Sequence, residues 1–285
     1  MSLSPRVLLS IDYEPWFAIF RRYDSLTNPV QRKKLDDSFT LEALEPVLER
    51  LGDAKASIYL VGEIVHWYPQ IPQKIVAAGH ELGLHCQFHR PLIDITELSA
   101  DLQSSGGWCR EYQVRGYRAP MVGISESAYE LLGNSGFSYS SSIYAPAGTL
   151  LKKHSVWELP VSTLKLFGKS ESYTAPRDFS LKLLMNGEFP YGSSFTIGLL
   201  EKAVLKIIES QLKAGLSPVV IMHPYELMRS RKWFSRTWWD IVLHPTLFPF
   251  TWNKTNFLAS LLRNFPVSSL GGYLNEALGE SKTSS

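Results

Sequence analysis

The sequence of 285 residues predicts an α/β fold in which parallel strands alternate with helices. Short apolar runs of strand length recur along the chain, and helical patterns lie between them. Ionisable residues also stand at or just after the end of several of these runs. In a parallel α/β barrel the carboxyl ends of the strands share one rim. One barrel can reach this length, so we expect a single domain over residues 1–285.

The first half of the chain holds three of the expected strands. Residues 7–11 form an apolar run that ends at Asp12, residues 56–61 form a second strand, and residues 81–85 form a third. Leucines recur at helical spacing over 41–51, with Thr40 as the expected N-cap. A second helix is expected over 69–78, where Gly79 follows. Residues 18–39 show no clear period, so we expect an irregular segment there.

The second half continues the alternation. A helix is expected over 95–104, ended by Gly106 and Gly107, and a strand over 113–118. Residues 125–132 predict a helix, and residues 157–161 predict a strand around Pro160. An amphipathic helix over 199–214 precedes the apolar strand 218–222, which leads into His223. Strands and helices at this spacing favour βαβ units.

Composition narrows the class of protein. Apolar residues make up 45% and charged residues 20% of the chain, which are ordinary globular values. The chain lacks a basic stripe, so we expect no nucleic-acid partner. Two cysteines without CxxC spacing favour free thiols in a reducing compartment. The N-terminus lacks the apolar region of a signal peptide and no apolar run reaches transmembrane length, so we expect a cytoplasmic protein.

The stretch HELGLHCQFH, residues 80–89, contains three of the seven histidines. His85 and His89 stand four residues apart, a spacing that can place two imidazoles on one metal ion. Taken alone this spacing is weak, because such pairs also occur on surfaces by chance. His80 lies a strand length upstream and is expected to be structural.

Two carboxylates follow the first expected strand. Asp12 and Glu14 are two residues apart, so both point to the same face if the strand continues through them. One could complete a two-histidine, one-carboxylate metal site and the other could accept the proton of a water. Carboxylates solvated at a strand end are the alternative.

Two further residues are expected at the same rim. Arg118 in the stretch GYRAP could hold a carboxylate through its guanidinium. His223 follows the last strand and is either a core histidine or a general acid toward a leaving group.

These segments together resemble the polysaccharide deacetylase family, the NodB-type domain of carbohydrate esterase family four. The matching stretches are LLSIDYE, ASIYLVGEIVHWYPQIPQKIVAAGHELGLHCQFHRPL, VRGYRAP, GFSYSSSIY and VVIMHP, in family order over roughly residues 5–226. The form of the first motif is similar to the exopolysaccharide and surface-glycan branch. The resemblance implies a deformed (β/α) barrel, with residues 227–285 as a C-terminal extension.

The resemblance also implies a divalent metal, usually zinc, with cobalt, manganese or nickel as alternatives. By motif position, His85 and His89 are metal ligands, and Asp12 is the catalytic base. Arg118 orients that base, and His223 is the general acid. Where the family commonly has a second aspartate, this chain has Tyr13, so Glu14 is the expected third ligand; Asp12 and Glu14 could also exchange these roles.

Two other positions depart from the family pattern. Met121 stands where the family has an aromatic residue, and its backbone N–H is expected to face an oxyanion. Ser140 stands where an aspartate is often found, so the carboxylate that assists His223 must come from elsewhere, with Glu158 as a candidate.

Residues 228–252 interleave basic and aromatic side chains, a composition that suits peripheral contact with a membrane. A folded cover that buries these rings is the alternative, favoured by Pro245 and Pro249. If the membrane reading holds, the protein works at the inner face of the membrane on a lipid-linked sugar.

The sequence thus predicts a metal-dependent hydrolase that removes an N-acetyl group from an amino sugar of a glycan or lipid-linked precursor. Deformylation of a lipid-linked amino sugar is one alternative. A carbohydrate-binding relative without activity is the other, motivated by Ser140. The oligomeric state stays open.

Overall fold

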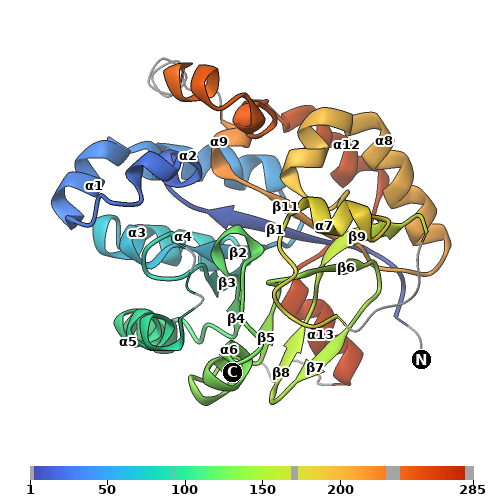
Figure 1. The fold of residues 1–285 in the computed structure, drawn as a ribbon, viewed down its shortest axis with the longest axis horizontal. Helices are drawn as coiled ribbons and strands as arrows, with labels where there is room; N and C mark the ends of the chain where they lie inside the picture. Colours follow the sequence, from blue (N-terminus) through green and yellow to red (C-terminus); the bar gives the residue numbers. More distant parts are fainter. Residues whose placement is uncertain (1–2, 91, 93, 168–172, 229–237, 280–285) are drawn as a thin grey trace.

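A computed structural model describes residues 3–90, 92, 94–167, 173–228 and 238–279 (Figure 1). Its main sheet has the strand order β11-β1-β2-β3-β4-β5-β8-β7, and β12 pairs with β1. Every neighbouring pair in it is parallel except β7 and β8. The strands are β1 (Val7–Tyr13), β2 (Ser57–Leu60), β3 (Glu81–Leu84), β4 (Gly116–Tyr117), β5 (Tyr139–Ser140), β7 (Leu151–Lys153), β8 (Val156–Glu158), β11 (Val219–Met222) and β12 (Val267–Ser268).

A second, three-stranded sheet lies beside the first, in the order β10-β9-β6 (Figure 1). Its strands are β6 (Tyr144–Pro146), β9 (Val161–Lys165) and β10 (Glu188–Phe189). β6 and β9 are parallel, and β10 runs antiparallel to β9.

Helices surround the curled main sheet (Figure 1). The helices of the first half are α1 (Pro29–Asp36), α2 (Phe39–Leu51), α3 (Gly62–Trp67), α4 (Gln70–Ala77), α5 (Ile95–Glu111) and α6 (Ala128–Asn134). Those of the second half are α7 (Leu181–Met185), α8 (Ser194–Lys213), α9 (Pro224–Leu227), α11 (Phe248–Thr251), α12 (Thr255–Asn264) and α13 (Leu270–Leu278). Among the described residues, four 3₁₀ turns are η1 (Trp16–Ile19), η2 (Arg21–Tyr23), η3 (Pro120–Val122) and η4 (Pro245–Leu247). No helix in these described ranges is both long and apolar enough to cross a membrane.

The central strands are buried on both faces, which is why they read as apolar runs in the sequence. All seven residues of β1 are buried, as are all four of β2 and all four of β11. Gly83 on β3 leaves room for the ring of Tyr59, its register partner on the neighbouring strand β2. A Cβ on Gly83 would lie 2.3 Å from a ring carbon of Tyr59, so a larger residue there would displace the tyrosine.

The predicted fold class is confirmed, and several expected boundaries are corrected. Residues 29–36 form α1 rather than an irregular segment, because Asn28 caps the N-terminus and Pro29 occupies the first turn. Helix α5 continues through Gly106 and Gly107, since burial of Trp108 favours the helix beyond them. Pro160 separates β8 from β9, where one strand was expected.

A buried carboxyl connects α1 to α2. Asp36 Oδ2 accepts hydrogen bonds from the hydroxyl of Thr40 at 2.9 Å and from that of Tyr68 at 3.3 Å. Asp36 Oδ1 is buried without a hydrogen-bond partner. Burial raises the pKa of Asp36 to about 7, although the hydrogen bonds from Thr40 act to lower it.

We predict that Asp36 makes the protein less stable as the pH rises from 5 to 8. A raised pKa means that the folded state holds the proton more tightly than the unfolded state, so the contribution is complete below about pH 4 and is lost as the pH passes through about 7. Urea unfolding at several pH values measures this. The wild type should lose roughly 2 to 3 kcal/mol more than Asp36→Asn over this range. Parallel curves for the two proteins would contradict the prediction.

Candidate functional site

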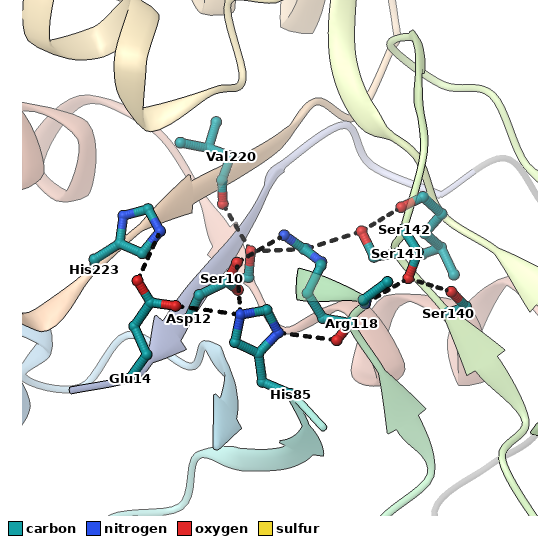
Figure 2. Close-up of polar contacts among 12 residues, drawn as sticks. Ser10, Asp12, Glu14, His85, Arg118, Ser140, Ser141, Ser142, Val220 and His223 are labelled. Carbon is teal, nitrogen blue, oxygen red and sulfur yellow. Dashed lines mark hydrogen bonds and ion pairs between the residues drawn. The ribbon is translucent and has the colours of Figure 1, made fainter. Parts of the chain in front are cut away.

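The strand register gathers the residues that follow the strands. β1 pairs with β2 and β11, β3 pairs with β2, and β4 pairs with β3, all in parallel. His85, Arg118 and His223 are the residues directly after β3, β4 and β11. They therefore lie next to the end of β1, which carries Asp12 and leads into Glu14 (Figure 2).

Glu14, His85 and His89 form a cluster whose ligand atoms all lie within 4.8 Å of one another. Glu14 Oε2 is 2.8 Å from His89 Nε2 and 3.4 Å from His85 Nε2. This oxygen lies between the two imidazole nitrogens without a well-directed hydrogen bond from either. A buried oxygen and two nitrogens that converge in this way are a donor set suited to zinc.

Neighbouring groups orient two of these donors. His85 Nδ1 lies 2.9 Å from the carbonyl oxygen of Arg118, and because a carbonyl only accepts, this nitrogen carries the hydrogen. His85 Nε2 then has its lone pair toward Glu14 (Figure 2). Tyr225 donates a hydrogen bond to Glu14 Oε1 at 2.8 Å. The remaining oxygen, Oε2, faces the imidazoles. These residues fit a divalent cation.

Electrostatic interactions within the cluster shift the pKa values of Glu14 and His89 in opposite directions. Burial raises the pKa of Glu14, but the charge of His89 and the contacts with both imidazoles outweigh it, so the pKa is well below its usual range. Burial lowers the pKa of His89, but Glu14 reverses this and raises it. The buried carboxylate thus needs positive charge beside it.

Arg118 connects the Glu14, His85 and His89 cluster to Asp12. Its guanidinium is fully buried and donates to Asp12 Oδ2 at 3.4 Å, to Ser10 Oγ at 3.2 Å and to Ser141 Oγ at 2.9 Å. It also lies over the ring of Tyr59, 4.8 Å from the ring centre. The other carboxylate oxygen, Asp12 Oδ1, is buried and has no hydrogen-bond partner among the described residues. Asp12 is therefore held through one of its two oxygens.

The turn after Arg118 has an uncommon backbone shape. Met121 and Val122 have φ values of 55° and 56°, a left-handed conformation that bulky and β-branched residues rarely adopt. The Ala119 N–H donates to Ser142 Oγ at 2.9 Å, which fixes the start of the turn. Such strain tends to occur at functional sites.

The suggested partnership of Glu158 with His223 is wrong. Glu158 accepts hydrogen bonds from the backbone N–H of Ser142 and from the hydroxyl of Tyr129, so its role is to hold the Ser140–Ser142 turn. Ser140 donates to Ser142 Oγ within the same turn.

The carboxylate beside His223 belongs to Glu226. His223 Nδ1 is 3.3 Å from Glu226 Oε1, and the His223 N–H donates to Glu226 Oε2 at 2.8 Å. Lys254, from the C-terminal extension, donates to the same Oε1 at 2.7 Å. The hydroxyl of Ser194 also donates to this oxygen. The ring of His223 stacks on Tyr225 with centroids 5.0 Å apart. His223 Nε2 lies 4.0 Å from Glu14 Oε1.

This arrangement favours the charged form of His223. Burial lowers its pKa, but Glu226 and then Glu14 outweigh burial and raise it. Burial also raises the pKa of Glu226, and the charges of Lys254 and His223 bring it below its usual value. A buried imidazolium can therefore persist here.

The structure thus places Asp12, Glu14, His85, His89, Arg118 and His223 close together, while the role of the Met121 N–H stays a prediction. It also adds contacts from Ser10, Ser141, Tyr225, Glu226 and Lys254. Ser10 could have been found, because it lies two residues before Asp12 on the same strand face. Glu226 also had a local signal, since Glu three residues after a helix cap is the capping-box spacing. The contact of Lys254 with Glu226 spans 28 positions and has no local pattern.

Similarity to known proteins is found in comparisons of structure and not in comparisons of sequence. No protein-family model and no curated protein matches the sequence. Solved structures do match, and they define the fold as that of the polysaccharide deacetylases and carbohydrate esterase family four (CE4).

Three matches illustrate the range of this fold. A proposed polysaccharide deacetylase from Mycobacterium smegmatis is 18% identical with a TM-score of 0.54, over 92% of this chain and 95% of its own. A CE4 family pseudoenzyme from Bacillus anthracis is 14% identical with a TM-score of 0.50, over 97% and 67%. The PuuE allantoinase is 10% identical with a TM-score of 0.58, over 97% and 91%. Because the fold carries different activities, the reaction must be argued from the site.

We predict that Lys254 and Glu226 stabilise the protein only as a pair. Lys254→Met leaves the Glu226 carboxylate buried beside fewer positive charges and should cost about 3 to 5 kcal/mol in urea unfolding. Adding Glu226→Gln to it should recover much of that loss. Lys213→Met, at the exposed pair with Glu209, is the control and should change stability by less than about 0.5 kcal/mol. Equal or larger destabilisation of the double variant would contradict the buried pair.

Proposed function

We propose that this protein is a metal-dependent hydrolase that removes the N-acetyl group of an amino sugar. The observation that carries the proposal is the convergence of a carboxylate and two imidazoles, Glu14, His85 and His89, beside two groups suited to proton transfer. Asp12 Oδ2 lies 4.0 Å from His85 Nε2, and His223 Nε2 lies 4.0 Å from Glu14 Oε1 (Figure 2). A metal ligand set beside a base and an acid suits amide hydrolysis.

Glu14, His85 and His89 would hold the metal. Three protein ligands are the usual number in catalytic zinc sites, which keep a further position for water or substrate. Zinc suits two imidazoles and a carboxylate, and cobalt, manganese and nickel accept the same ligands. When bound, such an ion polarises the acetyl carbonyl and lowers the pKa of water toward ~7.

Asp12 is the proposed general base. Its Oδ1 has no hydrogen-bond partner among the described residues and would accept the proton of the attacking water. Arg118 fixes the other oxygen, Oδ2, through its guanidinium. Ser10 and Ser141 hold the guanidinium in turn, so the base keeps one orientation.

His223 is the proposed general acid, and Glu226 positions it. With Nδ1 beside Glu226, the Nε2 proton of the imidazolium faces the cluster and can pass to the amine as the C–N bond breaks. The backbone N–H of Met121 would stabilise the oxyanion that forms when water adds to the carbonyl. The products are acetate and a free amino sugar.

An acetate-release assay tests this function. Zinc-loaded protein is offered N-acetylhexosamine oligomers and lipid- or nucleotide-linked N-acetyl sugars. We expect acetate from at least one of these, and Asp12→Asn should lower kcat by about 10² to 10⁴-fold because it removes the base. Glu209→Gln, at an exposed carboxylate, is the control and should keep full activity.

The same assay separates the alternatives. Formate from N-formyl substrates, without acetate, would replace deacetylation by deformylation. Glycan binding without release of either acid, in zinc-loaded protein, would overturn the enzyme proposal and leave a binding protein.

A further inference from the structure

An exposed apolar surface lies on the segment between α9 and α12. We call it the aromatic face, and it comprises Trp238, Trp239, Val242, Leu243, Phe248 and Trp252. Each of these side chains is more than 40% exposed, and Trp239 and Leu243 reach 68% and 69%. Soluble proteins rarely expose so many large apolar side chains within fifteen residues, and such surfaces mark interaction sites.

The helix over residues 238–243 has its apolar stripe turned outward. Trp238 and Val242 are four positions apart, as are Trp239 and Leu243, so all four share one side of the helix. Between them Asp240 is only 2% exposed. A surface helix ordinarily buries its apolar stripe and exposes its carboxylates. Trp239, Val242 and Leu243 therefore offer an exposed apolar surface to a partner outside this chain.

Helix α8 lies directly against the segment that carries the aromatic face. A Cβ on Gly198 of α8 would lie 2.3 Å from the carbonyl oxygen of Pro249 in α11. The next two residues of α8, Leu199 and Leu200, are exposed apolar side chains as well.

The charges in the sequence around the aromatic face indicate which kind of partner binds it. Asp240 is the single acidic residue of 228–252, and it is buried and paired with Arg22 at 2.7 Å. The sequence just before Trp238 carries four basic residues, Arg229, Arg231, Lys232 and Arg236, which lie outside the described residues. In the sequence the exposed tryptophans follow this run of basic residues directly, and such a composition suits an anionic membrane, where rings enter the headgroup region and cations meet phosphate.

The aromatic face is connected to the active site. Phe250 of α11 lies edge-on to His223, with ring centroids 6.1 Å apart, and 5.7 Å from the ring of Phe195. The segment that carries the aromatic face therefore also forms part of the surroundings of the proposed acid. In Figure 1 the unlabelled orange helices, over residues 238–243 and 248–251, lie on the same side of the molecule as α9, which directly follows His223.

We propose that the aromatic face docks on an anionic membrane and presents the site to an amino sugar carried on a lipid. The membrane contact stands on the exposed apolar side chains and on the basic sequence that precedes them. The choice of a lipid-linked substrate rests in addition on the proposed deacetylase function.

Co-sedimentation with vesicles tests the membrane contact without using activity. Intact protein should bind vesicles of phosphatidylcholine with 30% phosphatidylglycerol, and much less to phosphatidylcholine alone. Raising salt should weaken the binding. The double variant Trp239→Ser, Leu243→Ser should reduce partitioning at least tenfold, because two inserted apolar side chains are lost.

A matched control removes apolar side chains that are exposed elsewhere. Val30→Ser with Val76→Ser, on α1 and α4, should bind vesicles like the wild type, and circular dichroism should show both double variants folded. No binding by intact protein, or equal binding by the Trp239/Leu243 variant, would overturn the membrane contact. So would a stable dimer that this variant abolishes, since a second copy would then cover the face.

Activity assays test the lipid-linked substrate separately from the membrane contact. If the protein deacetylates, the Trp239/Leu243 variant should keep its kcat/KM on a short soluble N-acetyl oligomer and lose at least tenfold on the lipid-linked sugar in vesicles. Vesicle binding without any acetate release would leave the membrane contact standing and remove the proposed function. Equal loss on both substrates would overturn the lipid-linked assignment.

Discussion

The fully buried guanidinium of Arg118 donates to Asp12, Ser10 and Ser141, while the carbonyl oxygen of the same residue orients His85. One residue at the end of β4 thus fixes both the proposed base and a proposed metal ligand. This is feasible because parallel pairing places the ends of β1, β3 and β4 side by side. Loss of register in any of these strands would separate the proposed base from the proposed metal ligand.

A buried cluster of charges is costly unless each charge has a partner. Asp12 has Arg118, and Glu226 has both Lys254 and His223. Glu14 differs, because its Oε2 faces only imidazoles, and a neutral imidazole offers little to offset a buried carboxylate. Positive charge at this point, from a metal or from protonated histidine, is a physical requirement of the arrangement.

Much of the fold and the site could be predicted from the sequence because the relevant signals are local. Apolar runs mark buried strands, and the ionisable residue after each run falls on the common rim, which is how Asp12, His85, Arg118 and His223 are found. Helix ends were less predictable. Gly106 and Gly107 disfavour a helix by propensity, yet tertiary packing of α5 outweighs that preference.

The carboxylate beside His223 was not identified from local sequence patterns. Ser140 indicates that the usual carboxylate is missing, and the sequence alone suggested Glu158 as its replacement. The structure instead uses Glu226, held by Lys254 from beyond the five motifs. Lys254 and Glu226 are 28 positions apart, which is not a helix or strand spacing, so the sequence gives no signal for their contact. The C-terminal extension thereby contributes both to the proposed acid and, through Phe250, to its surroundings.

Glu14, and not Asp12, is the proposed partner of His85 and His89 around a metal. The most direct measurement is anomalous scattering at the zinc edge from crystals grown with zinc. We predict one strong peak about 2.0 to 2.2 Å from Glu14 Oε2, His85 Nε2 and His89 Nε2. A peak bound to Asp12 instead of Glu14, or none at this cluster under saturating zinc, would contradict it.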